Sequence, residues 1–235
     1  MGKYIYNSSK IKIIRIMSGN SPLLISSKGC NILVDTGIKK RWETITRNID
    51  KFLKNGKLNA LILTHAHYDH VENVAAIKEK YNPLVIIHEK EAKYLIAGIS
   101  SPLLECGHST GAKINKCKKA KHFFTSINPD ILIEDSFDLA QYGIDGKIIS
   151  TPGHSIGSIS IIIDDVGIIG DALGGMTKKP FAKSMNIASQ ETENSWLKLI
   201  DLNCNKYIPS HGNTEYSNDD LKKMYVDYKE IIEIY

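Results

Sequence analysis

Three histidines and an aspartate fall within six residues, in the segment His65-Ala66-His67-Tyr68-Asp69-His70. This HxHxDH cluster directly follows an apolar run, so the chain has to fold with a strand that ends in a ligand-rich loop. His65 and His67 alternate as in an extended segment, and their side chains can therefore meet one metal ion from the same side. Asp69 and His70 lie where the loop turns into a helix and can reach a second metal. Imidazole nitrogen and carboxylate oxygen suit zinc, and also manganese and iron. The alternative is a solvated histidine-rich loop that binds nothing.

Four more polar residues each close a short apolar run. They are Asp35, His154, Asp171 and His211, and a Pro-Gly turn precedes the second of them. In α/β architecture the ends of strands are where sites are assembled. Each residue taken alone is most simply a turn or capping residue. Together with the histidine cluster they predict one site at one edge of the sheet structure.

Short runs rich in Ile, Val and Leu, bounded by Gly, Pro, Asp or Asn, predict strands along the whole chain. These runs cover residues 11–17, 23–26, 31–34, 60–63, 84–87, 131–133, 147–150, 158–163, 166–169 and 206–208. Helical periodicity predicts helices over residues 42–53, from about 71, over 191–200 and over 221–232. Ser217 with Asp220 resembles a capping box for the last of these helices. His88, which follows a strand-like run, is expected at the surface. The predicted fold class is α/β.

The composition excludes several classes of protein. Apolar residues make up 42% and charged residues 24% of the chain, which is ordinary for a globular protein and excludes extensive disorder. The net charge of +4 is too small to indicate nucleic acid as a partner. No apolar run reaches the roughly 18–20 residues of a membrane helix, and the N-terminus does not resemble a secretory signal. The four cysteines form no CxxC pair and are expected to be reduced thiols of a cytoplasmic protein.

One domain is expected to span residues 1–235, with a loop or lid insertion around residues 98–128. The insertion is rich in Lys, Gly, Ser and Pro, and it either covers a site or forms a plain surface excursion. It carries Cys106, His108, Cys117 and His122. These residues could form a separate zinc site. The favoured interpretation is that they are ordinary loop residues.

The complete motif set resembles that of the metallo-β-lactamase superfamily, over the chain from Asp35 to His211. The resemblance implies a four-layer αβ/βα sandwich, in which two mixed β-sheets are flanked by helices. It also implies a site for two divalent metal ions, zinc with iron or manganese as the other candidates. The implied ligands of the first metal are His65, His67 and His154, and those of the second are Asp69, His70 and His211. Asp171 would bridge the two metals, and Asp35 would order the metal loop by hydrogen bonds.

Departures from individual branches of the superfamily narrow the function. Penicillin-hydrolysing members usually place a Cys in the second site or lack the last His of HxHxDH, whereas this chain has His70 and no Cys near a motif. Flavodiiron members carry Glu at the position of His67, and nucleases carry extra arms or domains. Hydroxyacylglutathione hydrolases add a helical C-terminal extension, but only about 20 residues follow Asn213, which argues against glutathione. Some lactonases of similar length use a Tyr soon after the bridging Asp, and residues 172–182 contain none.

The resemblance therefore implies a hydrolase that activates water against an ester, thioester or lactone carbonyl of a small molecule. Asp69 would orient the nucleophile and pass a proton to the leaving group. One alternative is a persulfide dioxygenase with a single iron held by His65, His154 and Asp171. Another is a metal-binding relative that has lost turnover. No nucleic acid or membrane partner is expected, and the sequence indicates neither the substrate-binding residues nor the oligomeric state.

Overall fold

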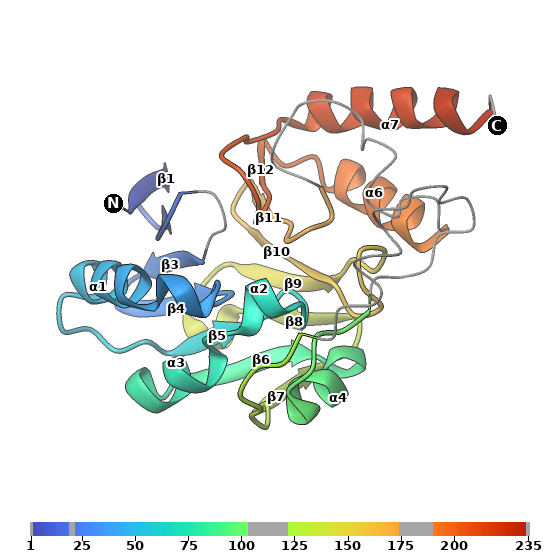
Figure 1. The fold of residues 1–235 in the computed structure, drawn as a ribbon. Coiled ribbons are helices and arrows are strands. Elements are labelled where there is room, and N and C mark those ends of the chain that lie inside the picture. The colour runs from blue at the N-terminus through green and yellow to red at the C-terminus, as the bar shows by residue number, and fades with distance from the viewer. Residues whose placement is uncertain (1, 19–21, 103–121, 174–189, 234–235) are drawn as a thin grey trace.

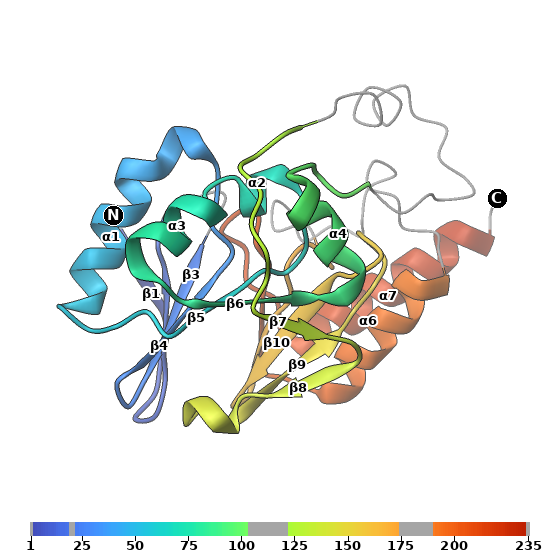
Figure 2. The same ribbon diagram turned by 90° about the horizontal axis from the view of Figure 1, so that it is seen from below.

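Two β-sheets lie face to face, with helices on the outer side of each (Figures 1 and 2). The structure is a computed structural model that describes residues 2–18, 22–102, 122–173 and 190–233. The larger sheet has the order β1-β2-β3-β4-β5-β6-β7 and the smaller sheet has the order β12-β11-β10-β9-β8. This arrangement is the four-layer sandwich expected from the sequence, and the predicted fold class is confirmed.

The larger sheet is mixed. Its strands are β1 (Lys3–Asn7), β2 (Lys12–Arg15), β3 (Leu23–Ser27), β4 (Cys30–Val34), β5 (Ala60–Ile62), β6 (Leu84–His88) and β7 (Ile131–Ile133). Neighbours from β1 to β4 pair antiparallel, and neighbours from β4 to β7 pair parallel. Because parallel strands run in one direction, the loops after β4 and β5 leave the sheet at the same edge.

The smaller sheet is mostly antiparallel. Its strands are β8 (Ser136–Asp138), β9 (Gly146–Ser150), β10 (Ile159–Ile163), β11 (Val166–Ile168) and β12 (Lys206–Ile208). Only β11 and β12 pair parallel among these described strands. The helices are α1 (Trp42–Leu53), α2 (Tyr68–Val71), α3 (Val74–Tyr81), α4 (Glu89–Ala97), α6 (Gln190–Leu202) and α7 (Asn218–Glu233), with short 3-10 turns at Lys39–Arg41 and Ala140–Tyr142.

Alternation along the strands explains the layers. Ile13 packs into the cluster between the two sheets, whereas its neighbour Ile14 packs into the cluster beneath α1, α3 and α4. In the smaller sheet, Ile161 lies in the cluster between the sheets and Ile162 packs with Trp196 of α6. Successive side chains of a strand point to opposite faces, and both faces are covered here. The strand sequences are therefore continuous apolar runs and do not alternate between apolar and polar residues.

Two local predictions had different outcomes. The capping box at the start of α7 is confirmed: the Asp220 carboxylate accepts a hydrogen bond from the Ser217 backbone N–H at 2.9 Å, and Ser217 Oγ accepts one from the Asp220 N–H at 3.1 Å. The surface position expected for His88 is wrong, because only 2% of that residue is exposed. Its Nδ1 accepts a hydrogen bond from the Lys90 N–H at 3.1 Å, so the ring caps the buried start of α4.

The described ends of the 98–128 segment meet each other. The Ser100 N–H donates to the His122 carbonyl at 2.9 Å, and Ile99 forms a bridge with Phe123. The His122 ring stacks on the ring of Tyr68 in the HxHxDH segment, with 4.1 Å between the two ring centroids. Cys106, His108 and Cys117, for which a separate zinc site was considered, lie outside the described residues. No helix in the described part of the chain combines the length and apolar character needed to cross a membrane.

Candidate metal centre

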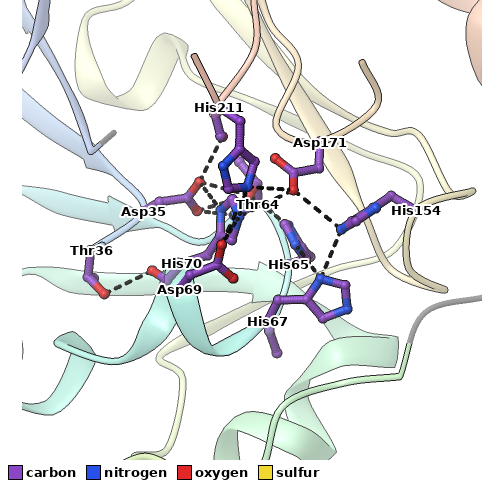
Figure 3. A network of polar contacts seen from close by, with 12 residues as sticks. Asp35, Thr36, Thr64, His65, His67, Asp69, His70, His154, Asp171 and His211 are labelled. Atoms are coloured by element: carbon purple, nitrogen blue, oxygen red, sulfur yellow. Dashed lines mark hydrogen bonds and ion pairs between the residues drawn. The ribbon is translucent and has the colours of Figure 1, made fainter. Parts of the chain in front are cut away.

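All the ligands expected from the sequence converge at one end of the sandwich (Figure 3). Asp35 follows β4, and the HxHxDH segment follows β5. His154, Asp171 and His211 follow β9, β11 and β12 of the other sheet. The site therefore forms where loops from the two sheets meet, which agrees with the rule that strand ends assemble sites in α/β proteins.

Three imidazoles form the first group of candidate metal ligands, called the first ligand group below. His67 Nδ1 lies 2.9 Å from His65 Nε2 and 2.9 Å from His154 Nε2. Gly153 brings His154 to this position, because its φ of +147° and the 2.8 Å that would separate an added Cβ from Thr192 Cα both require glycine. Three nitrogens that face one point are the arrangement of a three-histidine metal site.

Burial keeps these rings in the form that binds metal. Burial, with the nearby His70, lowers the pKa of His67 to about 4. Burial also lowers the pKa of His154 to about 3 and that of His65 well below its usual value. Neutral imidazole is the metal-binding form, so all three rings are available as ligands at neutral pH.

A second ligand group lies beside the first. His70 Nε2 is 3.3 Å from His211 Nε2. Asp69 Oδ2 lies 3.8 Å from His70 Nε2 and 3.4 Å from His211 Nε2. One carboxylate and two imidazoles offer three ligand atoms within 4.8 Å of one another. Asp69 and His211 are partly exposed, so this side of the site opens toward solvent.

Asp171 lies between the two groups. Its Oδ2 is 3.0 Å from His211 Nε2, 3.4 Å from His70 Nε2 and 3.4 Å from His154 Nε2. Burial opposes ionisation of this carboxyl group, but His70 and its neighbours hold its pKa well below the usual value. Asp171 is thus an anion that touches both groups.

The donor set fits metal ions better than it fits a closed hydrogen-bond network. Asp171 Oδ1 is buried and has no hydrogen-bond partner among the described residues. An unpaired buried carboxylate oxygen is costly, and it indicates a ligand that the protein chain itself does not supply. Asp171 Oδ2 lies beside nitrogens of both ligand groups, and Oδ1 has no partner in the described part of the chain, so the residues present fit a pair of metal ions.

Asp35 sets the orientation of one ring in each group. Its carboxylate can only accept, so the Thr64 hydroxyl, 2.9 Å from Oδ2, donates to it. The Thr64 oxygen then accepts from His65 Nδ1–H at 3.0 Å, which leaves the lone pair of His65 on Nε2, toward the site. Asp35 Oδ2 also accepts directly from His70 Nδ1–H at 2.8 Å. A single buried carboxylate therefore fixes the tautomer of both rings.

Sequence reasoning missed the partners of Asp35. Thr64 donates through its backbone N–H as well, at 2.8 Å, and Ser210 Oγ donates at 3.2 Å. Both residues directly precede a ligand histidine in the sequence. Their position beside the motif was the available signal, but only the folded chain shows that they converge on Asp35.

Acid is expected to destabilise the metal-free protein through His67 and His154. In the unfolded chain both rings titrate near 6.5, whereas in the folded chain their pKa values are about 4 and about 3. Unfolding therefore takes up protons as the pH falls below 6.5, and the free energy of unfolding falls with it. His70 acts in the opposite sense: burial lowers its pKa, but Asp171, Asp35 and Asp69 outweigh burial and raise it well above 6.5.

Urea unfolding of chelator-treated protein at several pH values between about 7.5 and 5 measures this dependence. His154→Ala should flatten the decline in stability, whereas His122→Ala, at an exposed histidine, should leave it unchanged. Equal slopes in the wild type and the His154 variant would show that the ring is not buried in neutral form.

Comparisons with known proteins agree with this geometry. Residues 17–211 match the family described as the metallo-beta-lactamase superfamily. A probable metallo-hydrolase of Methanocaldococcus jannaschii is 35% identical over 158 residues, which cover 66% of this chain and 68% of that protein. A hydroxyacylglutathione hydrolase of Shewanella pealeana is 24% identical over 53% of this chain, but the match covers only 37% of that protein.

Solved structures show the same fold. The metallo-beta-lactamase SMB-1, bound to 2-mercaptoethanesulfonate, superposes with a TM-score of 0.70 at 16% identity, covering 99% of this chain and 95% of that one. A metallo-beta-lactamase of Cronobacter sakazakii gives a TM-score of 0.66 at 16% identity over 94% and 90% of the two chains. The family match over most of the sequence and the metallo-hydrolase relative together show that the chain belongs to the metallo-beta-lactamase superfamily.

Proposed function

We propose that this chain is a dinuclear metal-dependent hydrolase that acts on an ester, thioester or lactone carbonyl of a small molecule. The observation that carries the proposal is the position of Asp171. It contacts histidines of both ligand groups, and its second oxygen is buried without a partner in the described part of the chain. Zinc is the first candidate for both metal ions, with iron or manganese as the others.

The proposed ligands of the first ion are His65, His67 and His154, and those of the second are Asp69, His70 and His211, with Asp171 shared. When bound, such a pair of cations lowers the pKa of a water molecule toward neutrality and polarises the carbonyl oxygen of a substrate. The chain supplies the negative charge that balances two cations through Asp69 and Asp171.

Asp69 is the proposed catalytic residue. Its carboxylate lies at the open side of the site, 3.4 Å from His211 Nε2. There it can accept a hydrogen bond from the attacking water, fix the direction of its lone pair and carry a proton toward the leaving group. Asp171 cannot do this equally well, because only 6% of it is exposed.

The acyl nature of the substrate is supported by relatives. Two matched proteins are named hydroxyacylglutathione hydrolases, so relatives of this sequence bear the name of an enzyme that hydrolyses an acyl compound. The matches span only 37% and 50% of the length of those two proteins. We therefore propose an acyl substrate for this chain but do not propose that it contains glutathione. A cytoplasmic location and the lack of nucleic acid or membrane partners stay predictions from composition.

Metal content of the purified protein, measured by inductively coupled plasma mass spectrometry, tests the proposal. About two zinc, manganese or iron ions per chain are expected, together with turnover on a panel of small thioesters, esters and lactones. One iron per chain with persulfide-dependent oxygen uptake would support the dioxygenase instead. A protein that holds no metal even after reconstitution would contradict the proposed centre.

Asp35→Asn is expected to weaken both metal sites by about 10–100-fold, the usual cost of losing a hydrogen-bond partner of metal ligands. The asparagine amide cannot accept from Thr64, His70 and Ser210 together. Competition with a chromophoric chelator measures the two affinities. Because φ at Asp35 is +60°, asparagine is the suitable replacement: it tolerates this left-handed conformation, whereas alanine would add backbone strain.

The control for this variant is Asn82→Asp, which exchanges the same two residue types in reverse at a left-handed position away from the site, where φ is +47°. It should leave both metal affinities unchanged. If Asp35→Asn also bound both metals as tightly as the wild type, the proposed control of His65 and His70 by Asp35 would be wrong.

A further inference from the structure

A buried carboxylate on α4 joins two of the loops that form the metal centre. Glu91 is 0% exposed. Its Oε2 accepts a hydrogen bond from the Ala66 backbone N–H at 2.9 Å, and its Oε1 accepts one from the Gly157 backbone N–H at 3.0 Å. Burial of a carboxylate is costly without such partners. These two hydrogen bonds therefore explain how the buried carboxylate is tolerated, but they do not by themselves explain what role a glutamate has at this position.

The two amides belong to the loops that carry the first ligand group. Ala66 lies between His65 and His67, in the loop after β5 of the larger sheet. Gly157 lies three residues after His154, in the loop between β9 and β10 of the smaller sheet. Glu91 thus connects the two sheets at the place where His67 Nδ1 lies 2.9 Å from His65 Nε2 and 2.9 Å from His154 Nε2.

The packing around Glu91 is built for this contact. A Cβ at Gly157 would lie 2.6 Å from Glu91 Cγ and 3.2 Å from His88 Cγ, so only glycine lets the loop approach the carboxylate. Glu91 is the third residue of α4, where the helix dipole favours a negative charge. The His88 ring provides the cap of this helix through the Lys90 N–H.

We infer that Glu91 is a positioning residue for the first metal, because it fixes the loop of His65 and His67 relative to the loop of His154. It acts through the two backbone amides whose hydrogen bonds its carboxylate oxygens accept. This inference rests on the proposed metal centre. According to this inference, the affinity of one of the two metals depends on Glu91, a residue that belongs neither to the ligand groups nor to the hydrogen bonds around Asp35.

Three variants separate geometry from charge. In Glu91→Gln, the amide nitrogen of the new side chain faces one of the two backbone N–H groups, so one loop loses its acceptor. Glu91→Asp keeps the charge but is shorter by one methylene group, so it cannot span both loops. Glu89→Gln is the matched control, since it removes the same charge from the same turn of α4 at an exposed position.

Chelator competition with zinc and cobalt(II) absorption, both on protein stripped of metal, measure the two affinities without any assay of turnover. We expect Glu91→Gln to lower one of the two affinities by about 10–100-fold and Glu91→Asp to lower the same one. His154→Ala should abolish that same step and so identify it as the first site. Glu89→Gln should bind both metals as the wild type does.

The outcomes are distinguishable. A wild-type chain that binds no metal would remove the proposed centre and this inference with it. A wild type with two sites and a Glu91→Gln variant with unchanged affinities would overturn the inference alone. Equal losses in Glu91→Gln and Glu89→Gln would also overturn it, because general charge would then be the cause.

A measurement on the unmodified protein covers the case in which the Glu91 variants fail to fold. In the metal-free wild type, the amide protons of Ala66 and Gly157 should exchange with solvent much more slowly than those of an open loop. Rapid exchange of both amides before metal is added would show that Glu91 does not hold the loops, and the inference would fall.

Discussion

Replacing Asp171 with alanine is expected to remove metal and turnover together, with a loss of at least about a thousandfold in kcat/KM, or about 4 kcal/mol of transition-state stabilisation. The reason is its position: one oxygen lies 3.0 Å from His211 Nε2 and 3.4 Å from the Nε2 atoms of His70 and His154, while the other has no partner in the described part of the chain. Two cations side by side repel each other strongly, and the Asp171 carboxylate between the two ligand groups offsets this repulsion.

Asp171→Asn refines the experiment. It keeps the shape of the side chain but removes its charge, and its N–H₂ group would point at imidazole nitrogens or at a cation. We expect the second metal to be lost and the first to be weakened, with kcat/KM close to that of the alanine variant. Metal analysis and steady-state kinetics on the same preparations provide both measurements.

The control lies at the other end of the same strand. Asp165 precedes β11, as Asp171 follows it, and its carboxylate accepts hydrogen bonds from Tyr6 and Asn205 far from the metal centre. Asp165→Asn should therefore cost some stability and leave metal content and kcat/KM intact. An Asp171→Ala protein with full metal and full turnover would contradict the proposed bridging position.

The parts of the fold that the sequence predicted are those with a strong local pattern. β10 and α1 were found because one is a run of isoleucines interrupted only by Ser160 and the other places Ile45, Ile49 and Leu53 on one face. β1 and β8 were missed. The first is an edge strand of exposed and half-buried residues, and the second has only three residues, Ser136–Asp138, without a β-branched side chain.

α4 was missed for a reason connected with function. Its sequence, EKEAKYLIA, has a weak apolar period because Glu91 occupies a buried position where an apolar residue would be expected. The error on His88 concerns the same helix, because its buried ring caps the start of α4. A charged residue inside a core face is a local conflict, and such conflicts concentrate at functional sites.

The convergence of the candidate ligands was predictable, and the contacts that support them were not. The histidines and aspartates stand in short motifs at strand ends, so sequence order alone indicated them. The contacts of Asp35 with Thr64 and Ser210 join residues 29 and 175 positions apart in the chain. Spacing carries no information about such contacts: the first depends on the pairing of β4 with β5, and the second on how the two sheets pack.

Replacing Asp69 with asparagine is expected to lower kcat by about 100- to 10,000-fold, the range of general acid–base catalysis, with a much smaller change in KM. Asparagine keeps an oxygen that can serve as a ligand at the open side of the site, beside His211. The first ligand group contains no atom of Asp69 and should hold its metal as before. At saturating metal the second site should fill as well, and the loss in kcat should persist, because the amide can neither take up the proton of the attacking water nor return it.

Kinetics across a range of metal concentrations, with metal content measured on the same samples, separates this role from a ligand role. Glu72→Gln is the control: it lies three residues further along, and its carboxylate accepts a hydrogen bond from the Lys39 backbone N–H at 2.6 Å outside the ligand groups. It should retain the kcat of the wild type. If added metal restored the kcat of Asp69→Asn, Asp69 would be a ligand without a part in proton transfer. If kcat instead stayed low with both sites filled, the missing function would be the proton carrier at the mouth of the site, since every other proposed ligand would still be in place.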